Sequence, residues 1–163
     1  MVLRRGQVDL AGLAPECVEG ARLAAAAHGV ALSADVDADA VVDGDAGRLA
    51  RLLDNLVRNA IAATPAGGSV VVSSGRGSAG GWLAVADDGP GIPETDQARL
   101  FEPYVRGTHG GESGAGLGLA IARAVAEAHG ATVSLESAEG LETIIVVEGL
   151  PLAPGVAEPA ARR

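Results

Sequence analysis

The sequence predicts a two-layer α/β (α+β) sandwich, in which a mixed sheet of about five strands is covered on one face by three helices. Three segments, 13–28, 45–65 and 117–128, carry apolar residues at the spacing of an amphipathic helix. Short β-prone segments lie between them. Segment 94–113 has no sustained periodicity, which is unusual in a compact domain unless the loop is functional, so we expect a mobile lid there.

Length and composition are those of one soluble domain. The chain has 163 residues, of which 48% are apolar and 2% aromatic, so its core must be built from Ala, Val, Leu and Ile. Residues 1–12 show no clear period and are interpreted as a linker at a domain junction. We expect the folded domain to span 13–152, and the Pro/Ala-rich residues 153–163 to be a disordered tail.

The net charge bears on the kind of partner this chain can bind, and the cysteine content bears on its redox compartment. The net charge of -9 would repel a phosphate backbone, so the sequence argues against a nucleic-acid binder. The single cysteine, Cys17, lies on the apolar side of a helical pattern and indicates a buried thiol in a reducing compartment. No apolar run approaches the ~18 residues that span a bilayer. We therefore expect a cytoplasmic domain without direct membrane contact, whose parent protein could still be anchored.

The first half of the chain gives two helices with two strands between them. The helix over 13–28 is closed by Gly29, and strands are expected at 30–36 and 40–43, joined by an acidic turn. Asp45 can cap the second helix, and Pro65 ends it. Its apolar positions form one broad stripe, made of Leu49, Leu52, Leu53, Leu56, Val57, Ala60 and Ile61.

The second half predicts two strand pairs separated by the lid and the third helix. Strands 69–74 and 82–87 are expected to pair around a glycine-rich hairpin loop at 75–81, and strands 132–137 and 143–147 around a turn at 139–140. The third helix should bury a stripe made of Leu117, Ile121, Ala124, Val125 and Ala128.

Two asparagines on the second helix are candidate ligands. Asn55 and Asn59 are about 40° apart on the helical wheel, and Asn59 lies on the flank of the apolar stripe. A side-chain amide offers an acceptor oxygen and two donor hydrogens, which suit Mg²⁺ or phosphate. Taken alone, a pair of this kind is more typical of two solvated helix residues, so the remaining motifs must decide.

Two glycine-rich segments add a candidate anion site. Segments 87–93 (DDGPGIP) and 114–119 (GAGLGL) would let backbone approach a phosphate, and the second leads directly into a helix N-terminus. The GxGxG spacing and the absence of a preceding strand exclude a Rossmann fingerprint, and no lysine follows as in a P-loop. Asp87 ends an apolar strand, where its carboxylate can accept hydrogen bonds from an exocyclic amine or simply cap the turn.

Together, four segments carry a family resemblance: NLVRNA at 55–60, DDGPGI at 87–92, FEPY at 101–104 and GAGLGL at 114–119. In this order and at these separations they resemble the N, G1, F and G2 boxes of the catalytic ATP-binding domain of sensor histidine kinases. That domain has the Bergerat fold with a flexible ATP lid, which it shares with gyrase, Hsp90 and MutL. The resemblance covers residues 10–151, nearly the whole chain.

The resemblance implies a role for each motif position. Asp87 would accept a hydrogen bond from the adenine amino group, Asn59 would hold Mg²⁺, and Asn55 would support the phosphates. Arg106 would reach the γ-phosphate and, with Asn55, serve catalysis, while Phe101 and Tyr104 would anchor the lid. The further ATP-binding positions would be Gly89, Gly91, Ile92, Gly114, Gly116, Leu117, Gly118, Leu119 and Thr143.

The residue at position 55 also bears on the reaction. ATP-hydrolysing relatives carry a glutamate base four residues before the magnesium asparagine, and Asn55 cannot act as a base. The resemblance therefore implies transfer of the γ-phosphoryl group to a histidine of a separate dimerisation domain, and onward to a response regulator. His28, His109 and His129 lie in the wrong contexts to be the acceptor, so the chain alone should not autophosphorylate.

Some positions depart from the family pattern. Ala62 and Ala63 replace a usual lysine and tyrosine, and Glu142 stands where a glycine is common. These changes leave open a second interpretation, a degenerate regulatory module that binds nucleotide weakly and acts by docking a partner. An anti-sigma serine kinase is disfavoured because such relatives usually retain the glutamate that Asn55 replaces.

Overall fold

The core of the molecule is a five-stranded mixed sheet. The computed structural model describes residues 1–103 and 117–155. The strands lie in the order β2-β4-β5-β7-β6, with β2 parallel to β4 and every other neighbouring pair antiparallel. Their bounds are β2 (Ala31–Val36), β4 (Ser69–Gly77), β5 (Gly80–Asp87), β6 (Thr132–Ser137) and β7 (Thr143–Leu150). The expected sheet is thus confirmed.

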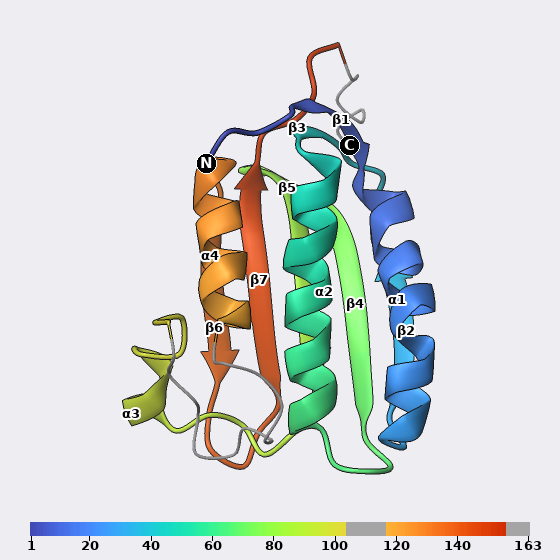
Figure 1. Cartoon of the computed structure of the whole chain (residues 1–163), viewed down its shortest axis with the longest axis vertical. Coiled ribbons are helices and arrows are strands. Elements are labelled where there is room, and N and C mark those ends of the chain that lie inside the picture. The colour runs from blue at the N-terminus through green and yellow to red at the C-terminus, as the bar shows by residue number, and fades with distance from the viewer. Residues whose placement is uncertain (104–116, 156–163) are drawn as a thin grey trace, which may run out of the picture.

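Three helices cover one face of this sheet, as expected (Figure 1). They are α1 (Leu10–Ala27), α2 (Ala46–Ala63) and α4 (Gly118–Ala128); a short α3 (Glu94–Gln97) lies apart from them. All seven residues of the predicted α2 stripe are buried, which explains why α2 takes the central place. Asp45 caps α2 by accepting a hydrogen bond from the Arg48 N–H at 3.1 Å. No helix among the described residues is long and apolar enough to cross a membrane.

The N-terminal residues are structured further than expected. Part of the segment interpreted as a linker forms strand β1 (Gly6–Asp9), which pairs antiparallel with β3 (Val41–Gly44). Val8 and Leu10 are buried, and the Asp9 carboxylate caps α1 through the Ala11 N–H. The linker interpretation is therefore wrong from residue 6 onward, because a four-residue strand whose partner is distant in sequence leaves no local period.

The C-terminal boundary shifts in the same way. Ala153 is buried, and its N–H donates to the Val41 carbonyl at 2.9 Å, so the packed chain continues past residue 152. The expected disordered tail falls mostly at 156–163, outside the described residues.

The predicted hairpin loop at 75–81 is much shorter in the structure. β4 continues to Gly77 and β5 begins at Gly80, so all four glycines of this segment are strand residues. A Cβ placed on Gly75 would lie 2.5 Å from the Trp82 ring. Glycine at this position makes room for the indole on the neighbouring strand. The sequence predicted a loop here because glycine-rich segments are usually loops, whereas this glycine has a packing role.

The buried stripe of α4 differs by a rotation from the predicted one. Ala122, Val125 and Ala126 are buried, whereas Ala124 is exposed. The rotation places His129, which follows the helix, in the core with 1% of its surface exposed.

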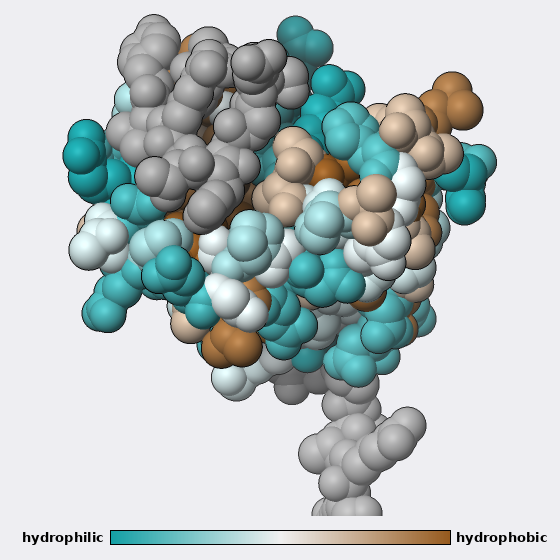
Figure 2. All heavy atoms as spheres, turned by 90° about the horizontal axis from the view of Figure 1, so that it is seen from below, coloured by the Kyte–Doolittle hydropathy of each residue, from teal (hydrophilic) through white to brown (hydrophobic). Residues whose placement is uncertain are grey.

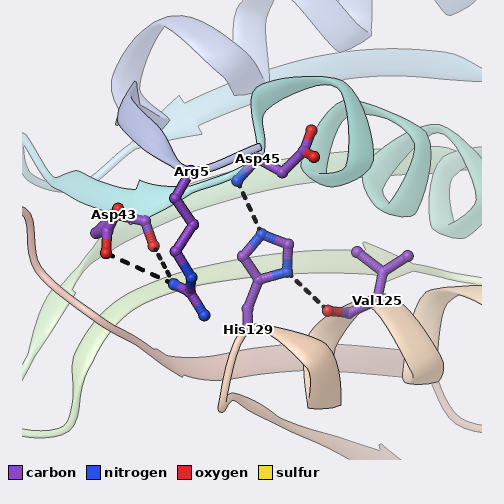
Figure 3. Close-up of polar contacts among 5 residues, drawn as sticks. All are labelled: Arg5, Asp43, Asp45, Val125 and His129. Atoms are coloured by element: carbon purple, nitrogen blue, oxygen red, sulfur yellow. Dashed lines mark hydrogen bonds and ion pairs between the residues drawn. The ribbon is translucent and has the colours of Figure 1, made fainter. Parts of the chain in front are cut away.

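His129 joins the end of α4 to the start of α2 (Figure 3). Its Nδ1 lies 2.7 Å from the Val125 carbonyl, and its Nε2 accepts a hydrogen bond from the Asp45 N–H at 3.0 Å. These partners require a neutral ring protonated at Nδ1. A Cβ on Gly44 would lie 3.0 Å from the ring, so a larger residue there would crowd it. His129 therefore fixes α4 against α2, the two helices that carry the candidate site.

Candidate nucleotide-binding site

The two asparagines face the N-terminus of α4. A Cβ placed on Gly118 would lie 3.8 Å from both Asn55 Oδ1 and Asn59 Nδ2, so both side chains approach the first residue of α4. Asn55 is half-buried and Asn59 is exposed. Among the described residues, Asn55 Nδ2 is buried without a hydrogen-bond partner. A buried amide donor without an acceptor is costly, and this one lies where an α-helix N-terminus favours an anion.

Asp87 lies at the end of β5, on the helix-covered face of the sheet. It is 8% exposed, and its Oδ1 accepts a hydrogen bond from the Gly89 N–H at 3.0 Å. Burial raises the pKa of this carboxyl; the Gly89 hydrogen bond opposes the rise, and the charges of Asp88 and Glu142 add to it. Thr143 is its cross-strand neighbour on β7 and is also buried. A carboxylate and a hydroxyl thus lie together at this end of the sheet.

The glycines after β5 allow close backbone packing. A Cβ on Gly89 would lie 2.8 Å from the Ala63 carbonyl oxygen, so the loop presses against the end of α2. Gly91 has φ +75°, and a Cβ there would overlap the Ala138 carbonyl oxygen. The loop that carries the G1 motif is therefore held between α2 and the β6–β7 turn, and only glycine fits at either contact.

A hydrogen-bond network that the sequence did not predict fixes the far end of this loop. The Ile92 N–H donates to Ser137 Oγ at 2.9 Å, and Ser137 Oγ lies 2.8 Å from Thr143 Oγ1. Gln97 Nε2 donates to the carbonyls of Ile92 and Ser137, both at 2.8 Å. Ser137 and Gln97 were missed because the Ile92–Ser137 and Gln97–Ser137 contacts span 45 and 40 residues of sequence, where no local pattern indicates a partner.

The remaining predicted positions divide into two groups. Leu117, Leu119 and Phe101 are partly buried, the last two packed against the core. Tyr104, Arg106, Gly114 and Gly116 lie outside the described residues, as does the second half of the expected lid, 104–113. Figure 2 views the molecule from below in the orientation of Figure 1. The coloured surface on this side is mostly hydrophilic, with small separate hydrophobic patches.

The donor chemistry of the site fits a magnesium ion bound with a nucleotide. Among the described residues, no three His, Cys, Asp or Glu side chains are grouped so as to hold a metal ion by themselves. Mg²⁺ commonly takes one or two protein oxygens and completes its shell with water and phosphate oxygens. The exposed Asn59 amide can supply such an oxygen, with Asn55 adjacent.

Comparison with known proteins identifies the class. Residues 44–154 match the family described as "Histidine kinase-, DNA gyrase B-, and HSP90-like ATPase", and the chain belongs to this family. Within it, the similarity is to the catalytic ATP-binding domain of sensor histidine kinases, as the four motifs predict.

Two curated relatives illustrate this. Sensor protein DivL of Caulobacter vibrioides is 42% identical over 113 residues, which are 69% of this chain and 14% of DivL. The probable sensor histidine kinase TcrY of Mycobacterium tuberculosis is 38% identical over 141 residues, 85% of this chain and 30% of TcrY. The chain thus spans less than a third of the length of either relative.

Two solved structures share the fold. Full-length ShkA in complex with AMPPNP gives a TM-score of 0.83 at 29% identity, covering 94% of this chain and 32% of that one. The mycobacterial sensor histidine kinase MprB gives 0.77 at 28% identity, covering 90% of this chain and 100% of that one. The expected two-layer fold is confirmed by these neighbours.

Proposed function

We propose that this domain binds Mg²⁺–ATP and donates its γ-phosphoryl group to a histidine of a dimerisation domain outside this chain. The observation that carries the proposal is the side chain of Asn55, which lies beside the first residue of α4 and has a buried Nδ2 without a partner among the described residues. A phosphate oxygen would satisfy this donor and would also meet the positive end of the α4 dipole. The AMPPNP bound by the ShkA neighbour supports a nucleotide as ligand.

Asp87 would recognise the base. Its buried carboxylate keeps Oδ2 for an exocyclic amine while Oδ1 holds the loop through Gly89. A purine that presents a carbonyl oxygen instead of the amine would face the carboxylate with an acceptor. We therefore expect a preference for adenine over guanine at this position. Thr143, directly across the ladder, can contribute a hydroxyl to the same base.

Asn59 would hold the magnesium ion, and Asn55 would bond the phosphates. When bound, Mg²⁺ neutralises charge on the phosphate oxygens. Because Asn55 is an amide, it can position a phosphoryl group but cannot remove a proton from water. The acceptor histidine would form the phosphorus–nitrogen bond as the bond to ADP breaks. In this scheme Arg106 would offset charge at the γ-phosphate, with Gly114, Gly116 and Tyr104 shaping the lid around it.

Transfer to a histidine would place the domain in a two-component pathway in the cytoplasm, with a response regulator as the final acceptor. The sensor proteins among the relatives support signalling partners of this general kind.

A degenerate regulatory module of the same fold is the second candidate. Ala62 is exposed and Ala63 half-buried at the end of α2, so the phosphate-side charge and adenine-side ring usual in the family are missing there. Nucleotide binding would then be weak, and the domain would act by docking a partner.

Calorimetric titration with ATP, with and without Mg²⁺, separates the two candidates. The kinase proposal expects Mg²⁺-dependent binding that weakens about tenfold or more in Asn59→Ala. Arg58→Ala is the matched control, since that exposed side chain is engaged by Asp54 of the same helix at 2.9 Å. No Mg²⁺-dependent binding at millimolar ATP would refute the kinase and leave the regulatory module. Acid-labile phosphate on an added dimerisation domain would establish the transfer itself.

A further inference from the structure

The second face of the sheet carries no helix in the described part of the chain (Figure 1). Side chains alternate along β5: Leu83 and Val85 point toward the helices and belong to the core, so Trp82, Ala84 and Ala86 point to the other face. We call this second side the open face.

The three central strands make the middle of the open face mainly apolar, with Ser73 as its polar member. In the ladder, Ala86 of β5 lies between Val71 of β4 and Ile144 of β7, and Ala84 lies between Ser73 of β4 and Val146 of β7. Ala84 is itself buried, whereas Val71, Ala86, Ile144 and Val146 are half-buried and lie outside the hydrophobic core cluster. A solvated antiparallel sheet usually presents polar side chains on such a face, so an apolar centre indicates a surface that another molecule covers.

Trp82 extends this apolar area along the same strands. It is the sole tryptophan of the chain and lies opposite Gly75 in the ladder. A Cβ on Gly75 would come within 2.5 Å of the indole, and one on Gly77 within 3.8 Å, so the ring lies over backbone that carries no side chains. A half-buried tryptophan held flat in this way costs little entropy to bury further, and tryptophan is enriched at binding hot spots.

The rim of the open face is polar and acidic. The outer strands present Ser33 and Asp35 on one side, and Thr132, Ser134 and Glu136 on the other. Glu148 lies across from Trp82. No lysine or arginine stands at an open-face position of the five strands, and the chain carries a net charge of -9. An apolar centre with a polar rim is the general anatomy of a protein interface.

We propose that the open face is a docking surface for an amphipathic protein segment whose apolar side chains are flanked by lysine or arginine. Basic groups would meet the carboxylates of Asp35, Glu136 and Glu148, and aliphatic groups would cover Trp82 and Val146. A second copy of this chain would bring acidic rim against acidic rim, and an anionic membrane surface would be repelled. A basic protein partner satisfies both the apolar centre and the acidic rim.

The test uses Trp82 as its own reporter. A synthetic leucine–lysine peptide of about 14 residues with helical spacing is titrated into the whole chain while tryptophan emission is recorded. We expect a blue shift with this peptide and none with a leucine–glutamate peptide of the same pattern. Val146→Glu should weaken binding about tenfold or more. Leu23→Glu, at a position 88% exposed on α1, adds the same charge elsewhere and should change the Kd less than twofold.

Circular dichroism checks that Val146→Glu folds. Glu136→Lys, a surface change, serves as a second variant that should also weaken binding of the leucine–lysine peptide. The proposal is overturned if the emission does not shift, or if Leu23→Glu weakens binding as much as Val146→Glu. Sedimentation showing a dimer through this face, or equal emission shifts with anionic vesicles, would overturn it as well. Asn59 and Asp87 are not on the open face, so failure here leaves the nucleotide titration unaffected.

Discussion

Replacing His129 by leucine tests whether this buried ring fixes α4 against α2. Leucine fills much of the same volume but removes the acceptor at Nε2, so the Asp45 N–H loses its partner. The Val125 carbonyl keeps one, because the His129 backbone N–H also donates to it at 3.2 Å. The loss therefore leaves one part-buried donor unsatisfied, which costs about 1–3 kcal/mol.

Urea denaturation measures this cost. With m of about 2 kcal/mol/M, the His129→Leu midpoint should fall by roughly 0.5–1.5 M at unchanged m. His129→Gln, whose carbonyl oxygen can accept from Asp45, should recover part of the loss. His28→Leu is the control: that ring is exposed, and its Nδ1 lies 3.0 Å from the Ala24 carbonyl of its own helix. Equal midpoints for His129→Leu and His28→Leu would refute the reasoning.

Two further predictions concern the site. Because burial raises the pKa of Asp87, the folded state binds a proton on this carboxyl more tightly than the unfolded chain does. The contribution of Asp87 to stability therefore falls as the pH rises from the ordinary pKa of 3.8 through the raised pKa of the folded state. Asp87→Asn should therefore lose ATP binding yet unfold at higher urea than the parent at pH 7, with the difference shrinking in acid; a variant less stable at pH 7 would contradict this. Gly91→Ala, with φ +75° and the Ala138 carbonyl in the way, should cost about 2 kcal/mol or more, whereas Gly140→Ala, at φ +80° with no atom within 4 Å, should cost about 1 kcal/mol in the same assay.

The part of the fold that depends on local periodicity could be predicted from the sequence. The α2 stripe is buried as predicted, with Asp45 as its cap, and the two antiparallel strand pairs form where alternation placed them. The spacing of apolar residues along the chain indicates which face of a helix or strand is buried, so these elements can be predicted without a structure.

The errors share one cause, which is pairing between distant segments. Strand β1 was missed because its partner β3 lies far along the chain, and Gly75 was assigned to a loop because its contact with Trp82 is across the sheet. The stripe of α4 was rotated for the same reason, since a partner on α2 draws His129 inward. Composition records which residues are present but not which distant groups they meet.

In the candidate site, too, some features could be predicted from the sequence and others depend on contacts between distant segments. The sequence by itself determined which residue types could bind Mg²⁺–ATP and that position 55 holds an amide instead of a carboxylate. Only the tertiary structure placed the Asn55 side chain beside Gly118 of α4 and buried its Nδ2. It also set Asp87 beside Thr143 and joined Ile92 to Ser137 and Gln97. The physical reason is that a motif specifies donors and acceptors, whereas burial and partnership depend on packing between elements far apart in the chain.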